Sequence, residues 1–338
     1  QDIELASRLS FFLWSTVPDE ELMNLAVNEK LSESSVLQEQ VERMLANPKA
    51  TSLAADFANQ WLYLRNLDGV EPNSRLFPNF DDNLRQSMRK ETELLFGSII
   101  SEDRNVMELL SADYTFLNER LAKHYNVPHV YGDHFRKVTL PDDSPRSGIL
   151  GHGSILTVTS YANRTSPVLR GKWVLDNILG IPPPPPPDDV PALPEHQSEV
   201  KVLTMRERMA KHRANPACAQ CHEIMDPIGL VFENFNAIGQ VRTVNTDHPA
   251  IDTKGNLPGG KPLYGVSGLR KDLLNNPDAF VGTMSEKLMT YALGRGLEYY
   301  DAPAIRKVIK QAAAQDFRFS SLVTAIVNST PFQMRRTL

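Results

Sequence analysis

The chain has 338 residues, 41% of them hydrophobic and 23% charged, with 36 basic and 41 acidic residues and a formal net charge of −5. This length is more than one ordinary hydrophobic core needs and predicts two domains. The charge balance gives no electrostatic footprint for nucleic acid or for an anionic membrane. No apolar run approaches the roughly 20 residues that span a bilayer.

Residues 1–126 have the pattern of consecutive amphipathic helices. In the first one, Leu5, Leu9 and Phe12 recur at helical spacing and form an apolar stripe. Helices are expected over residues 3–14, 17–26, 34–48, 51–67, 81–103 and 115–125. Strand signals are nearly absent before a short extended segment expected at residues 135–140. The region is therefore predicted to be all-α.

A proline run marks the clearest boundary in the chain. A Gly/Ser/Thr-rich loop over residues 148–165 leads into a helix expected to begin near Ser166-Pro167, and six consecutive prolines follow from Pro182 to Pro187. Such a run adopts a stiff polyproline II conformation of about 3 Å per residue. The alternative is a surface strap across one compact body. The predicted parts are a helical domain (1–180), a Pro-rich strap (181–199) and a second helical domain (200–338).

The second half begins with a capped helix, because Thr204 and Glu207 have the spacing of a capping box. Residues 226–282 are rich in glycine and are expected to be mostly loops, and Asp226 before Pro227 signals a turn. Further helices are expected over residues 277–300, 303–315 and 319–329.

The chain's two cysteines lie in "NPACAQCHEIMDP", residues 215–227, three positions apart. Covalent haem attachment needs two thiols for the two vinyl groups and an imidazole for the iron. Cys218, Cys221 and His222 supply all three within about one turn of chain. We therefore predict one covalently bound haem c, with His222 as the proximal ligand of its iron.

Other uses of paired cysteines each lack a part. A zinc site needs four ligands, and no second Cys pair or His pair at ligand spacing is present. A thioredoxin-type redox motif belongs at a strand–helix junction, whereas this pair follows a predicted helix. A disulfide across two residues would be strained and would leave His222 unexplained.

The order of a capped helix, CxxCH, a glycine-rich segment and an apolar helix resembles a class I cytochrome c, in which the first and last helices cross beside the haem. A more specific resemblance rests on the stretches "RLSFFLWSTVPDEEL", "RMLANP", "FANQWLYLRNL", "ADYTFLNERLAKHYNVP", "TSYANRTSPVLRGKWVLDNILGIPPPPPP", "HRANPACAQCHEIMDPIGLVFENFNAIGQVR" and "KLMTYALGRGLEYYD". On these stretches the chain resembles the planctomycete-type cytochrome proteins with consecutive DUF1592, DUF1588 and DUF1585 modules, and the resemblance covers the whole chain. It implies an exported redox protein whose modules usually follow an N-terminal portion with a cytochrome c motif of its own.

The second axial ligand is less clear, because the chain has no Met between Met225 and Met284. A class I cytochrome c usually takes a Met from this part of its chain, and Met225 is too close to His222 to reach the opposite haem face. The distal candidates are Met284, Met289, His248 and His152. The alternatives are core packing for the two methionines, a solvated loop for His248, and an iron with an open sixth position.

Two arginines are candidates for binding the haem propionates. Arg164 and Arg170 flank "TSPVL" and present the forked guanidinium that suits carboxylates. The alternative is an arginine near a helix start that pairs with a local acid. We further predict that the loop over residues 151–167 packs against the second domain and helps to enclose the haem.

These observations favour electron transfer to or from a redox partner protein or an upstream cytochrome portion. The alternatives are a haem peroxidase or oxidase, or a scaffold subunit of a larger exported complex. Thioether attachment of haem is completed outside the bacterial cytoplasm, so a periplasmic or surface-exposed location is expected. The chain opens with "QDIELASRLSFFLW", without an initiator Met or a signal-like segment. We therefore expect that a leader has been removed or that more protein precedes it.

Overall fold

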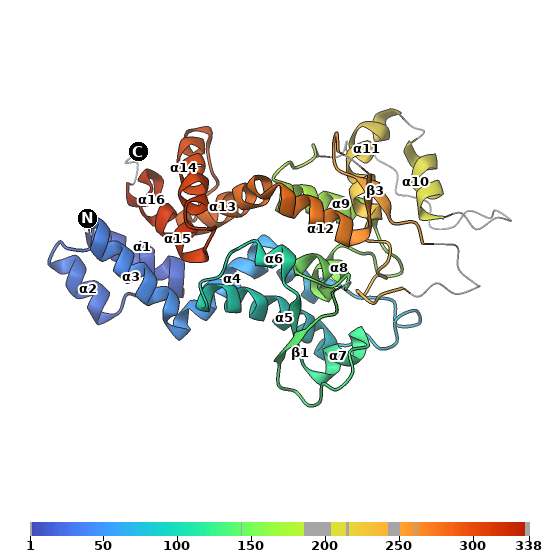
Figure 1. Cartoon of the computed structure of the whole chain (residues 1–338), viewed down its shortest axis with the longest axis horizontal. Helices are drawn as coiled ribbons and strands as arrows, with labels where there is room; N and C mark the ends of the chain where they lie inside the picture. The colour runs from blue at the N-terminus through green and yellow to red at the C-terminus, as the bar shows by residue number, and fades with distance from the viewer. Residues whose placement is uncertain are drawn as a thin grey trace.

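The structure is a computed structural model that describes residues 2–142, 144–185, 204–213, 216–242, 251–260 and 262–334. The described residues are mostly helical, which confirms the predicted all-α class. Figure 1 shows an elongated body with both chain ends at one end. Helix α11 (Pro216–Leu230), which carries the CxxCH motif, lies at the other. None of the helices in the described part of the chain is both long and apolar enough to span a bilayer.

Helices dominate residues 2–142. In chain order they are α1 (Asp2–Trp14), α2 (Glu20–Val27), α3 (Ser34–Ala46), η1 (Pro48–Ala50), α4 (Thr51–Trp61), η2 (Leu64–Gly69), α5 (Asp82–Ser101), α6 (Glu108–Ser111) and α7 (Glu119–Tyr125). Side-chain caps set several of their starts: Asp19, Asp81 and Asn118 each accept a hydrogen bond from a backbone N–H in the first turn that follows.

The remaining helices alternate with loops and one short hairpin. They are η3 (Ile149–Gly151), α8 (Gly153–Val158), α9 (Pro167–Val174), the π-helical turn η4 (Leu175–Leu179), α10 (Met205–Arg213), α11, α12 (Gly265–Asn275), α13 (Pro277–Leu293), η5 (Tyr299–Asp301), α14 (Ala302–Ala313), α15 (Phe319–Val327) and α16 (Thr330–Gln333). The capping box is confirmed, because the Thr204 N–H donates to the Glu207 carboxylate over 2.7 Å and the Glu207 N–H donates to Thr204 Oγ1 over 3.2 Å.

Two antiparallel hairpins interrupt the helices. Strand β1 (Tyr114–Leu117) pairs with β2 (Arg136–Thr139), and β3 (Lys254–Asn256) pairs with β4 (Pro262–Tyr264). The extended segment expected at 135–140 is confirmed, but the helix expected from residue 115 is wrong over its first turn. Asn118 caps α7 and holds residues 114–117 outside it, where they pair with β2.

Two expected loops are partly helical. The loop expected over residues 148–165 contains α8, whose six residues are nearly all buried. The turn expected at Asp226-Pro227 is absent, because α11 continues through both residues to Leu230. Pro227 lacks the N–H that would bond to the carbonyl four residues earlier, and α9 and β3 make close backbone contacts with α11 at Met225 and Pro227.

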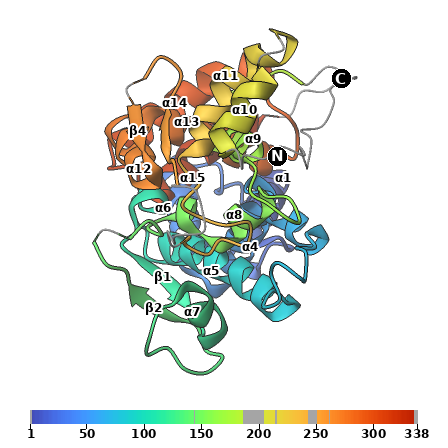
Figure 2. The ribbon, with the colours of Figure 1, turned by 90° about the vertical axis from the view of Figure 1, so that its right-hand side faces the viewer.

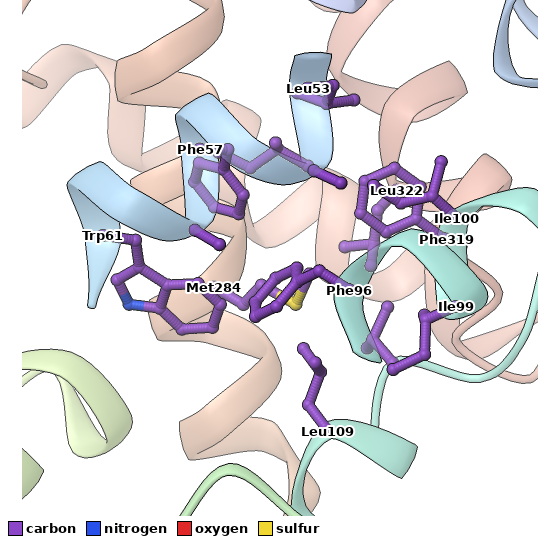
Figure 3. Close-up of a cluster of buried hydrophobic side chains, with 14 of the residues drawn as sticks. Leu53, Phe57, Trp61, Phe96, Ile99, Ile100, Leu109, Met284, Phe319 and Leu322 are labelled. Atoms are coloured by element: carbon purple, nitrogen blue, oxygen red, sulfur yellow. The ribbon is translucent and has the colours of Figure 1, made fainter. Parts of the chain in front are cut away.

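One hydrophobic core contains side chains from both sides of the predicted strap. Met284 of α13 lies among Phe57 and Trp61 of α4 and Phe96 of α5, all fully buried (Figure 3). The Phe57 and Trp61 rings stack with centroids 5.3 Å apart. Helices α13 and α15 thus cover the same core as the first helices of the chain.

The predicted strap and domain boundaries stay predictions. Residues 182–185 form neither helix nor strand, and residues 186–199 lie outside the described residues. The helix crossing of a class I cytochrome c also stays a prediction. In Figure 2, α10 and α11 lie on one side of the molecule and the β1–β2 hairpin with α7 on the opposite side, with α8 between them.

Candidate functional site

Helix α11 positions the residues of the CxxCH motif. Positions 218, 221 and 222 are spaced i, i+3 and i+4, so they share one side of the helix. Cys221 is a free thiol, half-buried, and packs against the core. His222 is also half-buried, with 14% of its side chain exposed. The side chain of Cys218 lies outside the described part of the structure.

A buried carboxylate holds the ring of His222. Asp226 lies one turn further along α11, is fully buried, and its Oδ1 is 2.9 Å from His222 Nδ1. A carboxylate accepts hydrogen bonds, so Nδ1 carries the hydrogen and Nε2 of the neutral ring carries the lone pair. A metal binds that lone pair, and a carboxylate on the other ring nitrogen is the usual support for such a ligand. The donor set therefore fits an iron ligated through His222.

Arg213, the last residue of α10, completes this arrangement. Its Nη1 donates to Asp226 Oδ2 over 2.9 Å, so both carboxylate oxygens accept a hydrogen bond. Arg213 is 24% exposed while Asp226 is buried, so the ion pair extends from the protein surface to the buried carboxylate beside His222 Nδ1. It also joins α10 to α11.

Three glycines bring neighbouring backbones into direct contact with α11. A Cβ on Gly171 of α9 would lie 1.9 Å from the Met225 carbonyl oxygen. A Cβ on Gly229 would lie 1.7 Å from the Pro167 oxygen, and one on Gly255 of β3 would lie 1.9 Å from the Pro227 oxygen. No other residue type fits at such distances. Helix α11 is therefore held between α9 and β3 by contacts that leave it no room to shift.

Arg170 ties α9 to the loop that follows α11. Its guanidinium is 2% exposed and donates to the carbonyls of Phe232 and Asn236, each over 2.8 Å. Burial lowers the pKa of Arg170 to about 10, and the nearby Glu233 carboxylate opposes this shift. The propionate role expected for Arg170 stays a prediction, and it would require exchanging these bonds.

Arg164 lies in the loop before α9. Its Nη1 donates to the neighbouring Thr165 carbonyl over 3.4 Å, and its guanidinium lies 4.5 Å from the centroid of the Tyr161 ring. These contacts place it on the partly exposed side of the loop, and its propionate role also stays a prediction.

The loop over residues 151–167 packs against the second half, as expected. The Cα of Gly153 lies 2.8 Å from the Cβ position of Gly239, and Arg146 just before this loop donates to the Gly239 carbonyl over 2.7 Å. His124 of α7 donates from Nε2 to the Ile238 carbonyl over 2.7 Å. Residues far apart in sequence thus fix the segment that follows α11. Its part in enclosing a haem stays a prediction.

The candidates for the second axial ligand lie in different places. Met284 and Met289 are fully buried in α13. His152 is buried against α5, where its Nδ1 is 2.9 Å from Thr92 Oγ1 and its Nε2 is 4.0 Å from the Glu91 carboxylate. Burial lowers the pKa of His152. His248 lies outside the described residues. The assignment of this ligand stays a prediction.

Three family models match the chain one after another. Residues 1–127 match "Protein of unknown function (DUF1592)", residues 146–245 match "Protein of unknown function (DUF1588)" and residues 259–332 match "Protein of unknown function (DUF1585)". The chain belongs to the DUF1592–DUF1588–DUF1585 family. This order is the planctomycete cytochrome c-type module architecture, as the resemblance predicted. No curated protein and no solved structure matches the chain.

The site of this DUF1592–DUF1588–DUF1585 protein is assembled from more than one module. Helices α9 and α11 belong to the DUF1588 part, whereas His124 belongs to the DUF1592 part and Gly255 lies after the DUF1588 match. The role of Asp226 was missed by the turn interpretation. The spacing of Asp226 four residues after His222 was the available signal, because such residues are neighbours on a helix.

Proposed function

We propose that the protein is an exported c-type haem protein that carries out electron transfer. The observation that carries the proposal is a CxxCH motif on one helix whose histidine is held at Nδ1 by the buried Asp226 carboxylate. Haem bound to Cys218, Cys221 and His222 would supply one-electron chemistry between ferric and ferrous iron. The match to cytochrome c-associated modules supports the same reading.

The chain's own groups supply attachment, orientation and an apolar environment. The two thiols anchor the group and Asp226 fixes the tautomer of His222. The glycine contacts of α9 and β3 hold the helix in place. The proposal includes a class I cytochrome c-like arrangement of residues 200–338. Met284, Met289, His152 and His248 are the residues that would supply a distal ligand.

The proposed setting is the periplasm or the cell surface. Haem is attached through thioethers outside the bacterial cytoplasm, and a redox partner protein, an upstream cytochrome portion or a larger complex would then exchange electrons with the haem. The hydrophobic core to which the helical first part contributes packs against Cys221, and it would supply low-dielectric surroundings beside the haem.

Attachment is tested on protein exported into a periplasm that has haem-maturation machinery. A pyridine-haemochrome spectrum should show an alpha band at the position for two thioether links, with one haem per chain. Cys218→Ala and Cys221→Ala should each move the band to the position for one link, and the double variant should hold no covalent haem. Ala219→Ser, between the two cysteines, is the matched control and should keep both links. Wild-type protein without thioether-linked haem would overturn the proposal.

The second candidate is a haem peroxidase or oxidase with an open sixth position. The observation that favours it is the His222–Asp226 pair, because a carboxylate strengthens electron donation from the imidazole to iron. A high-spin spectrum of the haem-loaded protein that changes on adding cyanide or peroxide would select this candidate. A low-spin spectrum that is inert to both would select electron transfer.

A further inference from the structure

The hydrogen bond between His222 and Asp226 joins a predicted iron ligand to a full negative charge inside the protein. Asp226 is completely buried, and the donor–acceptor distance of 2.9 Å is that of an ordinary strong hydrogen bond. Such a carboxylate does more than orient the ring. It draws the Nδ1 hydrogen toward itself and makes the imidazole a stronger donor at Nε2.

Arg213 acts on the same carboxylate with the opposite sign. Its guanidinium donates to the second oxygen of Asp226 over 2.9 Å and neutralises part of its charge. A carboxylate paired in this way attracts the Nδ1 hydrogen less strongly than an unpaired one would. The chain Arg213–Asp226–His222 therefore contains one group that strengthens the iron ligand and one that moderates it.

We propose that Asp226 and Arg213 are positioning residues that set the reduction potential of the haem through His222. This inference rests on the proposed function. A more strongly donating imidazole and a nearby negative charge both stabilise ferric iron over ferrous iron, so Asp226 lowers the potential. Arg213 weakens that effect and raises the potential.

A purely structural role is the competing explanation, because the ion pair also joins α10 to α11. In that case removing Asp226 or Arg213 would lower the stability of the fold in the same way. The two variants would then not be expected to shift the reduction potential in opposite directions. The sign of the potential shift separates the two explanations. Stability alone does not.

The first experiment measures the midpoint potential of haem-loaded Asp226→Asn by spectroelectrochemistry. The amide removes the negative charge and ends the preference for a hydrogen on Nδ1, so the potential should rise. Glu223→Gln is the matched control: this exposed residue of the same helix follows His222 directly and loses the same charge without contacting Nδ1. A rise in Asp226→Asn no larger than that in Glu223→Gln would overturn the inference.

The second experiment measures Arg213→Gln, which exposes Asp226 to His222 without its partner, so the potential should fall. Arg208→Gln removes a similar cation from an exposed position of α10 and should change the potential less. An unchanged or higher potential in Arg213→Gln would overturn the inference, and this variant decides alone if Asp226→Asn does not fold. Wild-type protein without covalent haem would instead overturn the proposed function, whereas haem-loaded variants with equal potentials overturn only the inference.

Discussion

At the residue scale, His124 is the clearest case of a side chain whose charge is governed by its surroundings. It is 4% exposed, it donates to the Ile238 carbonyl, and burial lowers its pKa to about 4 although the hydrogen bond opposes this shift. Arg146 adds a smaller effect in the same direction as burial. The histidine is therefore neutral in the folded protein over most of the pH range in which it would be charged in the unfolded chain.

This difference makes stability depend on pH in a defined window. The unfolded chain binds a proton at the ordinary value of 6.5 and the folded protein only near 4, so the free energy of unfolding falls as pH drops between these values. The shift corresponds to a loss on the order of 3 kcal/mol, because one pKa unit is worth about 1.4 kcal/mol. Thermal melts of His124→Gln, whose amide can still donate to the carbonyl, should show a shallower loss over that window.

The exposed His134 offers a matched control. His134→Gln should leave the acid dependence of the wild type in place, since it changes a surface histidine of the same part of the chain. His152 is also buried with a lowered pKa, so some acid dependence should remain in His124→Gln. If the stability of His124→Gln fell with decreasing pH as steeply as that of the wild type, His124 would have to be protonated in the folded protein without unfolding it.

At the element scale, the placing of α11 depends on backbone contact more than on side-chain packing. Gly171 of α9 and Gly255 of β3 approach α11 from separate elements, and each approach ends on a carbonyl oxygen of the helix. A side chain that clashes with a flexible neighbour can be accommodated, but a backbone carbonyl inside a helix cannot move alone. The geometry of the candidate site is therefore set by the absence of side chains at these positions.

Gly171→Ala should destabilise the protein strongly. Its Cβ would lie 1.9 Å from the Met225 oxygen, so we expect a loss of about 3 kcal/mol or more, at the upper end of the usual cost of overpacking. Gly97→Ala in α5 is the matched control, because nothing lies within 4 Å of its Cβ position and alanine favours a helix by about 1 kcal/mol. Denaturant titrations should give opposite signs, and equal effects would contradict the contact argument.

The amphipathic helices could be predicted because each buries one apolar stripe. Helix α3, for example, ends within two residues of its expected end. Helix α8 could not be predicted, because nearly all of its residues are buried and no polar face gives a period. Local spacing singled out Cys221 and His222 as site candidates, but it did not predict that both lie on helix α11, because the motif was expected to follow a helix. Nothing in the sequence near Arg146 or Arg170 shows that each is buried, because the Gly239 carbonyl that Arg146 binds and the Asn236 carbonyl that Arg170 binds lie more than sixty residues away.

At the scale of the whole molecule, the last helices complete the core that the first helices begin. Figure 3 shows Met284 of α13 between the aromatic rings of α4 and α5, with Phe319 and Leu322 of α15 nearby. Unfolding of either half should therefore expose apolar surface of the other.

Met284→Ala should test this shared core. The substitution leaves a cavity among Phe57, Trp61 and Phe96 and should cost about 2–5 kcal/mol. Because the core is shared, far-UV circular dichroism and tryptophan fluorescence should lose their native signals in one transition that moves to lower temperature. Met334→Ala, at a position that is 64% exposed, is the control and should leave the transition in place. Two transitions, of which only one moves, would mean that the halves unfold independently.

The contact between α1 and α16 has a consequence for how such a protein can change over generations. Arg8 donates to the carbonyls of Phe332 and Gln333, so the DUF1592 part is hydrogen-bonded to the C-terminal end of the DUF1585 part. Exchanging only the DUF1585 part for that of a relative would place new residues against α1. Recombination at the edges of the three sequence modules is therefore costly here. The three sequence modules are therefore more readily inherited together than exchanged one at a time.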